Sequence, residues 1–584
     1  MTRLCGPEST DSMQGALLRL AAGATRHTSR DAAARARLAL ECAARVAAEA
    51  DAWAQTAVAV KQPGSVVGKP GMPAGRSALA EEMATGPLAT LRLLVITARA
   101  LADIGRGGLP QARGPLRLAH SGAGIAGAAR IEVDVMPAPG LFDSMIFRGH
   151  SATVRCVNPG GIDAFTRVWQ LEAQSRPRSG GAAVVLGAGN VTGLAAADCI
   201  CQIFEHGRAS LLKLHPLHAP LEPVLRRALA PLIEAGLLEI ITGDAEVARA
   251  AASSSLVTHV HLTGGQAAFD ALVWGGRDPH APDAMPVLAK SITCELGNVT
   301  PWIVVPGNYT PAQLACQADT VAASIANNTS FNCIATKMVV TCRSWPQRDA
   351  FLGLVARRLA SLPARPAWYP GAAAAWQAIA GGQLPADGTL PWVFRTGIDI
   401  VRQPEWIARE WFVPVAAETA IDADDIEAFC TRASGLTHSL PGSLAASVTA
   451  PGSLSPRDRE RVELLLEHLE YGVVALNGWS ALAYALGSVP WGGFPGGTLA
   501  APASGIGRVH DPLLLPLVHN SIIRAPLVAW PEPPWFPWSP RGPQLARGLV
   551  ALYAAIARGE PVLWPLARML PDVILSAVCP AGRP

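Results

Sequence analysis

Two segments of the sequence carry residue types that could act together on a carbonyl group. Cys333 lies in the stretch NNTSFNCIATK, and Glu295 lies 38 residues earlier in CELGNVTP. A thiol is a good nucleophile, and a carboxylate at a strand end can take a proton from water. Because an acyl-enzyme reaction requires a nucleophile and a base, these two segments predict covalent cysteine chemistry.

A glycine-rich turn, GAGNVTG at residues 187–193, separates a strand pattern from a helix pattern. Such turns bind the phosphates of dinucleotides, but the usual second strand ends in an acidic residue that binds a ribose. Here that strand ends in Lys213, Leu214 and His215. The alternative is a tight turn without a ligand, in which Asn190 only caps the following helix.

The elements that must position these residues alternate between strand and helix. Residues 181–265 show this alternation, and residues 291–475 repeat it with ITCELG, PWIVVP, KMVVTC and YGVVALN. Such alternation predicts parallel sheets covered by helices, here in two α/β domains. Residues 15–60 and 77–105 are alanine-rich at helical spacing, and residues 128–157 predict an antiparallel pair of strands.

The composition narrows the class of protein. A chain of 584 residues predicts two or three domains, and 50% hydrophobic against 16% charged residues favours surface buried between subunits. No run approaches the roughly 18 to 20 apolar residues of a membrane-spanning helix, and the N-terminus has no signal-peptide core. We therefore expect a cytoplasmic oligomer. A net charge of +3 with scattered arginines gives no nucleic-acid footprint.

Other reactive side chains have simpler interpretations. The eleven cysteines are scattered without paired CxxC spacing, which predicts neither a disulfide framework nor a metal site. Cys294, next to Glu295, is a competing nucleophile. His259 and His261 lie in a predicted strand, and we interpret them as structural.

Further motifs follow one another in a characteristic order within residues 130–525. They are LLKLHP with Lys213, ITGD with Gly243, HLTGG with Thr263, Gly264 and Gly265, EWFVPV with Glu410 and Phe412, YGVVALN with Asn477, PWGGFPGG, and SGIGR. With Asn190, Glu295 and Cys333, this order resembles that of the aldehyde dehydrogenase superfamily, and the chain is identified as a divergent member. The resemblance implies two parallel-sheet α/β domains, one for cofactor and one for catalysis, and a small β extension for oligomerisation.

The resemblance implies a role for each matched residue. Cys333 would attack the aldehyde, Asn190 and the Cys333 N–H would bind the oxyanion, and Glu295 would activate water. NAD or NADP would be held by Lys213, Gly243, Thr263, Gly264, Gly265, Glu410 and Phe412. The implied reaction oxidises an aldehyde to a carboxylic acid through a thiohemiacetal and a thioester, in a homodimer or homotetramer.

Two alternatives stay open at this stage. An acylating enzyme would pass the thioester to coenzyme A, but such members commonly lack the base that Glu295 provides. A non-catalytic scaffold is favoured by the altered nucleophile segment, which replaces Asn-x-Gly-Gln-x-Cys by residues 328–333, NTSFNC. Lys337 stands where arginine is common. Pro216 replaces a glutamate that often selects NAD, so NADP stays open, and His215 and His218 could favour it.

The expected domain boundaries follow from these patterns. We assign residues 1–129 and 158–292 to the cofactor domain, 293–512 to the catalytic domain, and 130–157 with 513–530 to the oligomerisation strands. Residues 531–584 begin with WPEPPWFPWSPRGP and continue in a helical pattern. We expect this arm to pack on the body or on a neighbouring subunit, with a membrane-surface helix as the alternative.

Overall fold

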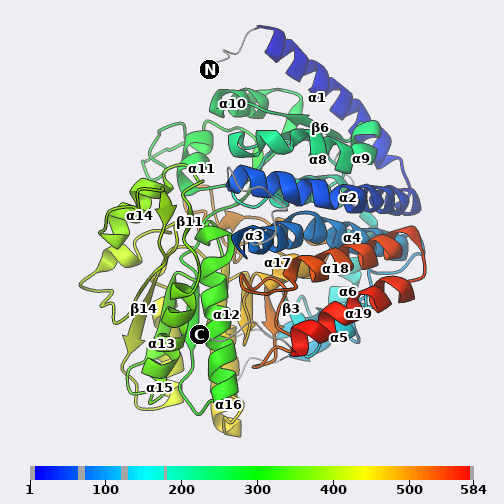
Figure 1. The fold of residues 1–584 in the computed structure, drawn as a ribbon. Helices are drawn as coiled ribbons and strands as arrows, with labels where there is room; N and C mark the ends of the chain where they lie inside the picture. The colour runs from blue at the N-terminus through cyan, green and yellow to red at the C-terminus, as the bar shows by residue number, and fades with distance from the viewer. Residues whose placement is uncertain (1–6, 63–72, 120–128, 176–179, 579–584) are drawn as a thin grey trace.

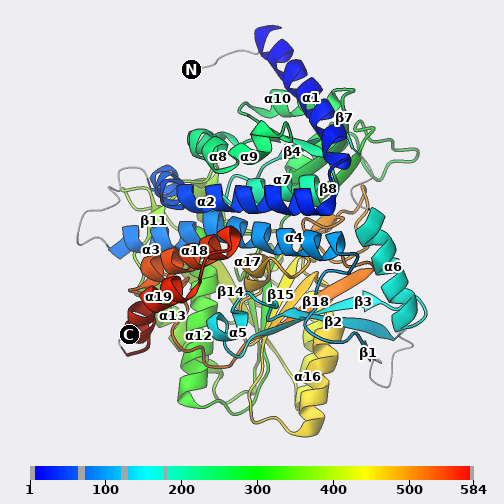
Figure 2. The same cartoon turned by 90° about the vertical axis from the view of Figure 1, so that its right-hand side faces the viewer.

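The computed structural model describes residues 7–62, 73–119, 129–175 and 180–578 (Figures 1 and 2). Within these residues the strands form a smaller sheet, a larger sheet and a short separate pair, β11 (Arg365–Pro366) with β12 (Thr389–Leu390). The smaller sheet has the spatial order β17 (Gly505–Ile506), β8 (Ser291–Glu295), β7 (Val257–Thr263), β4 (Ala182–Leu186), β5 (Ala209–Lys213) and β6 (Leu238–Ile241).

The smaller sheet is parallel except for β17, which runs antiparallel to β8. All side chains of β4 and β5 are buried, which is typical of parallel strands with helices on both faces. The helices that precede or connect the strands of this sheet are α6 (Ile162–Ser175), α7 (Leu194–Phe204), η2 (Pro216–Leu221), α8 (Glu222–Ala228), α9 (Ala230–Glu234), α10 (Ala245–Ser253) and α11 (Gln266–Val273).

The position of β8 corrects the expected domain boundary. The segment ITCELG was assigned to the catalytic domain, 293–512, but β8 pairs in parallel with β7 and so completes the smaller sheet. Its apolar residues Ile292 and Cys294 are buried on one side. Their alternation with Ser291 and Thr293 matches the half-polar pattern of the neighbouring β7, which explains the pairing. The crossing to the larger sheet therefore occurs after Glu295.

The larger sheet joins the second α/β unit to the antiparallel strands. Its spatial order is β1 (Arg117–Ala119), β2 (Arg130–Met136), β3 (Ser151–Val157), β18 (Val518–Arg524), β16 (Val473–Leu476), β15 (Ala445–Thr449), β9 (Pro301–Val304), β10 (Met338–Cys342), β14 (Val415–Ile421) and β13 (Val393–Arg395). β18 pairs parallel with β16 and antiparallel with β3, so the strands predicted for oligomerisation extend this sheet. Their role between subunits stays a prediction.

Helices also cover the larger sheet and line its loops. They are α5 (Asp143–Ile146), α12 (Pro311–Ala326), η3 (Asn327–Ser330), α13 (Arg348–Ala360), α14 (Ala372–Ala380), η4 (Pro404–Trp406), α15 (Ile426–Thr437), α16 (Pro456–His468) and α17 (Leu482–Leu486). In both views, α12 and α16 stand along the lower half of the molecule, beside this sheet (Figures 1 and 2).

The terminal helices form a layer across the middle of the molecule. Figures 1 and 2 show α2, α4 and α18 side by side between the two sheets, and α1 runs along the smaller sheet. These helices are α1 (Pro7–Thr28), α2 (Ala32–Lys61), α3 (Pro73–Met83), the π-helical turn η1 (Ala84–Leu88), α4 (Ala89–Gly105), α18 (Gly542–Arg558) and α19 (Leu563–Val578).

The C-terminal arm packs on the body of its own chain. α18 lies against α2, α3 and α4, and its Tyr553 hydroxyl accepts a hydrogen bond from Arg92, which is also paired with Asp143. The next helix, α19, keeps apolar side chains such as Leu563 and Trp564 exposed. Among the described residues, no helix is both long enough and apolar enough to cross a bilayer.

Candidate active site

The thiol of Cys333 and the carboxyl group of Glu295 are in contact. Cys333 follows η3 on the way into β10, and Glu295 is the last residue of β8. Cys333 Sγ donates to Glu295 Oε1 at 3.2 Å. The two segments that carry the predicted nucleophile and base therefore meet where the carboxyl ends of the smaller sheet face the loops of the larger sheet.

Glu295 is held by both of its oxygens. While Oε1 accepts from the thiol, Oε2 accepts from the Trp491 indole N–H at 2.8 Å. The backbone carbonyl of Glu295 also accepts from the Gly264 N–H at 3.0 Å. Burial raises the pKa of Glu295 to about 7, although the bonds from Cys333 and Trp491 oppose this shift. A fixed carboxyl group that titrates near neutral pH is suited to general base catalysis.

The thiol itself is not activated by its surroundings. Burial raises the pKa of Cys333, and the negative charges of Glu295 and Glu410 raise it further. A thiolate is therefore costly while both carboxyl groups are ionised. Because Glu295 Oε1 already accepts from the thiol, it is placed to take the thiol proton when Cys333 attacks.

The loop before Cys333 has an unusual backbone. Asn328, Thr329 and Ser330 have φ values of 51°, 58° and 62°, although none is glycine. Each left-handed residue costs about 1 kcal/mol or more, so surrounding contacts must hold the loop. Lys337 Nζ donates to Ser330 O at 3.2 Å and to Ser330 Oγ at 2.7 Å. Lys337 and Ser330, two of the positions that depart from the family pattern, therefore support each other by hydrogen bonds.

Asn190 lies directly beside this loop. Its Nδ2 donates to the Phe331 carbonyl at 3.2 Å, and Asn328 Nδ2 donates back to the Asn190 carbonyl at 3.0 Å. An amide nitrogen carries two hydrogens, so a second donor remains on Asn190 after the bond to Phe331. Gly193 and Gly86 pack so closely that a Cβ on either would overlap the opposite segment. The turn is therefore clamped against η1.

The N-terminal helices supply a polar support that sequence reasoning missed. Lys61 Nζ, at the end of α2, donates to Asn328 Oδ1 at 2.9 Å and to Glu82 Oε1 at 2.5 Å. Thr192 joins the network by donating to Glu82 Oε2 at 3.3 Å and accepting from Trp53 Nε1 at 3.1 Å. One signal was available in the sequence: only five lysines occur, and Lys61, Lys213 and Lys337 are all buried near this site.

Glu410 presents an acceptor that has no partner. It lies between η4 and β14, and its buried Oε1 has no hydrogen bond from any residue that the structure describes. A Cβ on residue 297 would overlap Glu410 Oε2, so Gly297 makes room for the carboxyl group. Burial raises the pKa of Glu410 and lowers that of Lys337, and the attraction between them opposes both shifts. An unsatisfied buried acceptor of this kind fits hydroxyl donors such as those of a ribose.

Phe412 belongs to an aromatic cluster near Glu410. Its ring lies 5.9 Å from Phe331 and 5.1 Å from Tyr369, measured between centroids. Phe331 in turn stacks on Tyr369 at 5.5 Å and meets Trp368 edge-on at 5.0 Å. Phe331 occupies the position where the family pattern has glutamine. The substitution thus joins the nucleophile loop to an aromatic wall.

The other predicted cofactor residues lie at the carboxyl ends of the smaller sheet, where ligands bind in parallel α/β folds. Lys213 ends β5 and is buried, which lowers its pKa. Gly243 follows β6 with φ 152°, where a Cβ would overlap Val247. Thr263 donates to Asp198 at 3.0 Å, and Gly264 bonds Glu295. Gly265 caps α11 with open space beside it.

Comparison with known proteins finds similar structures but no similar sequence family. Neither a family model nor a curated protein matches the sequence. Similar solved structures include an indole-3-acetaldehyde dehydrogenase complexed with NAD+, at 16% identity, TM-score 0.57 and 88% of each chain. An NADP-dependent glyceraldehyde-3-phosphate dehydrogenase from Bacillus halodurans, complexed with NADP, matches at 15% identity and TM-score 0.57, covering 89% of this chain and 92% of that one.

A third similar structure is the NAD-dependent aldehyde dehydrogenase from Sinorhizobium meliloti, at 16% identity and TM-score 0.56, covering 88% of this chain and 86% of that one. The chain has the aldehyde dehydrogenase fold. The α/β class with two parallel-rich sheets, predicted from motif order, is therefore confirmed. At identities this low the likeness establishes the fold, and the chemistry rests on the side chains.

Two histidines near the dinucleotide side of this aldehyde dehydrogenase fold carry no charge at neutral pH. The ring of His215 packs over Gly189 and stacks on Tyr369 at 6.3 Å. Burial, followed by the charge of Lys213, lowers its pKa, and burial lowers the pKa of His218 to about 3. The suggestion that these histidines attract a 2′-phosphate by charge is therefore not supported. Lys213 is the cation left at this strand end.

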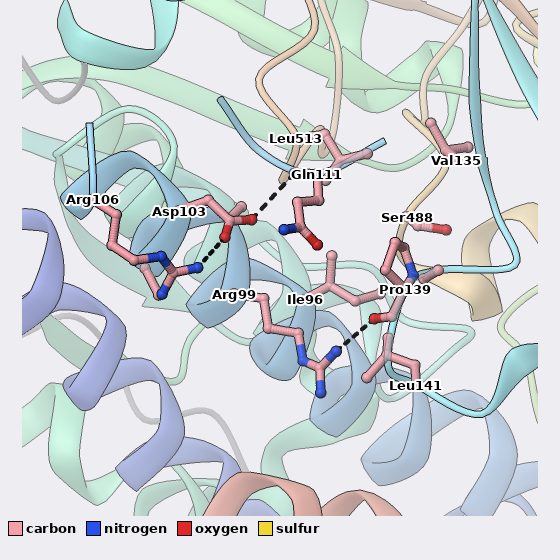
Figure 3. A pocket seen from close by; sticks show the side chains of 13 residues that line it. Ile96, Arg99, Asp103, Arg106, Gln111, Val135, Pro139, Leu141, Ser488 and Leu513 are labelled. Carbon is pink, nitrogen blue, oxygen red and sulfur yellow. Dashed lines mark hydrogen bonds and ion pairs between the residues drawn. The ribbon is translucent and has the colours of Figure 1, made fainter. Parts of the chain in front are cut away.

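A separate cavity of about 260 Å³ lies between α4 and the segment after β2 (Figure 3). Arg99 reaches across it to the Pro139 carbonyl at 2.6 Å, and Asp103 binds Arg106. Its charged groups are thus satisfied within the fold. Ser488 is a lining residue whose buried hydroxyl has no hydrogen-bond partner in the described part of the chain. The cavity includes none of the candidate catalytic or cofactor residues.

One cluster of metal-ligand types lies at the end of α7. Ligand atoms of Cys201, Glu205 and His206 lie within 4.8 Å of one another. The Glu205 carboxylate accepts the Asp511 backbone N–H at 2.8 and 3.0 Å, which links α7 to the segment after β17. The carboxylate thus has a structural role, and the absence of a metal site stays a prediction. The cysteines described in the structure are free thiols.

Proposed function

We propose that the protein oxidises an aldehyde to a carboxylic acid, with NAD or NADP as hydride acceptor. The observation that carries this proposal is the 3.2 Å contact between Cys333 Sγ and Glu295 Oε1 in the aldehyde dehydrogenase fold. A nucleophile next to a base with a pKa of about 7 is what acyl transfer at neutral pH needs. The known structures with this fold include complexes with NAD+ and with NADP.

In the first half-reaction, Cys333 attacks the aldehyde carbon as its proton moves to Glu295. A carbon–sulfur bond forms, and the carbonyl pair moves onto oxygen. The second hydrogen of Asn190 Nδ2 and the Cys333 N–H are the donors for this oxyanion. One such donor is worth about 3 to 4 kcal/mol in the transition state. A nicotinamide held by Glu410 and Phe412 would supply the hydride acceptor, and loss of hydride from the tetrahedral carbon would leave a thioester on Cys333.

In the second half-reaction, Glu295 returns as a carboxylate after losing the thiol proton and takes a proton from water. The resulting hydroxide attacks the thioester, the carbon–sulfur bond breaks to release the acid, and the departing Cys333 sulfur takes the water-derived proton from Glu295. The sum consumes one aldehyde, one water and one oxidised cofactor, and it produces one acid, one reduced cofactor and one proton. Trp491 holds the base in position throughout, through its bond to Oε2.

For the cofactor, we assign Glu410 and Phe412 to the nicotinamide ribose, since Glu410 Oε1 is an acceptor without a partner. Lys213 would bind the adenosine ribose, with Thr263 to Gly265 and Gly243 along the dinucleotide. No carboxylate stands at Pro216 to repel a 2′-phosphate, so we expect both NAD and NADP to be accepted. The retained Glu295 contact argues against both the acylating alternative and the scaffold alternative.

We also propose a homodimer or homotetramer in which the β1–β3 edge of the larger sheet contacts a second copy. β1 is the terminal strand of this sheet in the described chain, and a free edge can pair with another strand. A cytoplasmic location stays a prediction from the sequence.

The proposal is tested with a panel of aldehydes and each nicotinamide cofactor, followed at 340 nm. We expect Cys333→Ala to lower turnover by about 10³-fold or more while the cofactor Kd changes less than about threefold. Cys294→Ser is the matched control, since Cys294 is buried on the opposite side of β8 and burial raises its pKa to about 12. Full oxidation by Cys333→Ala, or no acyl adduct on the wild-type protein with any aldehyde, would exclude the mechanism.

A further inference from the structure

The two strands that lead to Glu295 carry an unbroken row of polar side chains. In the register of β7 with β8, His259 pairs with Ser291, His261 with Thr293, and Thr263 with Glu295. Because alternate residues of a strand share a face, these six side chains lie on one face of the smaller sheet. The row begins at Ser291, which is exposed, and ends at Glu295, which is buried.

Hydrogen bonds join the row from one end almost to the other. Ser291 Oγ bonds His259 Nδ1 at 2.8 Å, and His259 Nε2 bonds Thr293 Oγ1 at 3.0 Å. Thr293 Oγ1 also bonds His261 Nδ1 at 2.8 Å. On its other side, His261 Nε2 lies 3.4 Å from Asp198 Oδ1, and Thr263 Oγ1 donates to Asp198 Oδ2 at 3.0 Å.

Each imidazole and each hydroxyl in this row of hydrogen bonds can both accept and donate a proton. An imidazole accepts at one nitrogen and donates at the other, and a hydroxyl does both at one oxygen. Burial, with Arg208 and His261 nearby, lowers the pKa of His259 to about 3, so this ring stays neutral. A neutral imidazole passes a proton onward without storing charge. A buried row needed only for packing would not require this alternation.

The inner end of the row reaches the neighbourhood of Glu295. The negative charge of Asp198 raises the pKa of Glu295, and His261 lowers it, so both lie close to its carboxyl group. Geometry also joins the row to Glu295, because Thr263, which bonds Asp198, lies opposite Glu295 in the register of the two strands. The Tyr484 ring packs edge-on against Trp491, which bonds Glu295, and the buried Tyr484 hydroxyl has no hydrogen-bond partner within the described chain. The charges of Asp198, Glu295 and Cys333 all act on the pKa of this phenol. Its hydroxyl is the group available to connect Glu295 with Asp198.

We propose that this row, which we call the β7–β8 relay, carries the proton of Glu295 to the surface at Ser291. The proposal rests on the function proposed above, in which Glu295 must lose the proton that it took from the Cys333 thiol before it can activate water. The proton leaves Glu295 through the Tyr484 hydroxyl to Asp198 and passes to His261 Nε2. His261 Nδ1 then gives its proton to Thr293, and the Thr293 proton passes to His259 Nε2.

In the last step, His259 Nδ1 gives its proton to Ser291, and the Ser291 proton passes to water. One proton enters at Asp198 and one leaves at Ser291, so the relay gains no net charge. Rotation of the hydroxyls and exchange of the imidazole tautomers restore the starting state. The base can therefore be reset while the thioester still fills the space in front of Cys333.

The test is Thr293→Val, which removes the central hydroxyl at nearly constant volume. Stopped-flow mixing with an aldehyde and NAD separates the burst of NADH, which reports acylation, from the later rate, which reports deacylation. We expect deacylation to fall about tenfold, with the burst unchanged, and added imidazole to restore part of the rate. Thr293→Ser keeps the hydroxyl and should deacylate within about twofold of the wild type.

Thr341→Val is the matched control for loss of a buried threonine hydroxyl, since Thr341 bonds Glu418 in the larger sheet. It should leave both phases unchanged. Should Thr293→Val not fold, His259→Gln takes its place, because an amide keeps hydrogen bonds but has no second tautomer for relay. Its deacylation should also fall and respond to imidazole.

Three results would overturn the relay: wild-type deacylation in Thr293→Val, an equal loss in Thr293→Ser, or a loss that imidazole does not restore. These differ from failure of the proposed function, which would show as a wild-type protein without any NADH burst. A normal burst with a normal Thr293→Val rate removes the relay and leaves the proposed function standing.

Discussion

Glu295 and Glu410 are two buried carboxyl groups whose charges both act on the Cys333 thiol. Burial raises the pKa of each above its ordinary value. Glu295 ends a strand of the smaller sheet, and both of its oxygens accept hydrogen bonds. Glu410 lies on a loop of the larger sheet, next to Lys337, and its Oε1 has no hydrogen-bond partner among the residues described.

The difference in hydrogen bonding suits one carboxyl group to act as a base and the other to bind hydroxyl groups. A base needs a fixed position and a pKa near the working pH, and both follow from the strand, Trp491 and the burial of Glu295. A group that binds hydroxyls needs an open acceptor, which Glu410 has. Similar burial therefore raises both pKa values, and the neighbouring hydrogen bonds decide which chemistry each carboxyl group can perform.

The strongest test of this comparison is Glu295→Gln. We expect deacylation to fall by about 10² to 10⁴-fold, because glutamine cannot take a proton from water. Acylation of Cys333 by an activated ester bypasses hydride transfer, and intact-protein mass spectrometry should then show a long-lived acyl adduct. The cofactor Kd should not change. An adduct that disappears at the wild-type rate would assign the base to another group.

Glu410→Gln should show the opposite pattern. Glutamine lacks the charged carboxylate that would accept hydrogen bonds from the ribose hydroxyls. Since such bonds are worth about 1.5 to 3 kcal/mol, the cofactor Kd should rise by about 10 to 100-fold. Titration of cofactor fluorescence measures this, and ester-driven deacylation should stay normal. Glu405→Gln, at an exposed position of η4 just before this loop, is the control. If Glu410→Gln kept a normal cofactor Kd but slowed deacylation, Glu410 would be the base and not the group that binds the ribose.

The fold class could be predicted from the sequence because each strand, turn and helix is formed by residues close together in the chain. The order of the motifs then indicated how these elements follow one another. The strands β4 to β7 and the turn with Asn190 fall where their patterns indicate. The predicted sheet for β8 was wrong, because the sheet that β8 joins depends on pairing with a strand far away in the sequence. Local periodicity cannot encode this, whereas the polar match between β7 and β8 could have suggested it.

The candidate site was predictable at its centre and less so at its periphery. Cys333 and Glu295 stand in recognisable segments, and the structure brings them together. Lys61 reaches Asn328 from 267 positions away, on a helix whose alanine-rich pattern gives no functional signal. Such support depends on the packing of whole helices. The left-handed backbone at Ser330 could not be predicted either, because a glycine in a sequence indicates a positive φ and a serine does not.

Trp491→Phe tests how the position of Glu295 sets its pKa. The indole bond stabilises the ionised carboxylate, so its loss should raise the pKa of Glu295 above about 7. Glu295 acts as a base only when ionised, so the rising limb of deacylation against pH should move upward by about one unit. The rate should fall up to about tenfold at pH 7 and recover near pH 9. A parallel loss at all pH values would show that Trp491 only positions the carboxyl group.

Ser330→Gly tests the Glu410 side through Lys337 and should have the smallest effect. Glycine relieves the cost of φ 62°, about 1 kcal/mol, but removes the Ser330 Oγ bond from Lys337, worth about 1.5 to 3 kcal/mol. Lys337 keeps its bonds to the Ser330 and Val413 carbonyls. The net loss is about 0.5 to 2 kcal/mol, so the urea midpoint should fall modestly, and the cofactor Kd should change less than about threefold. A large loss of stability would mean that the serine hydroxyl, and not the carbonyls, holds Lys337 beside Glu410.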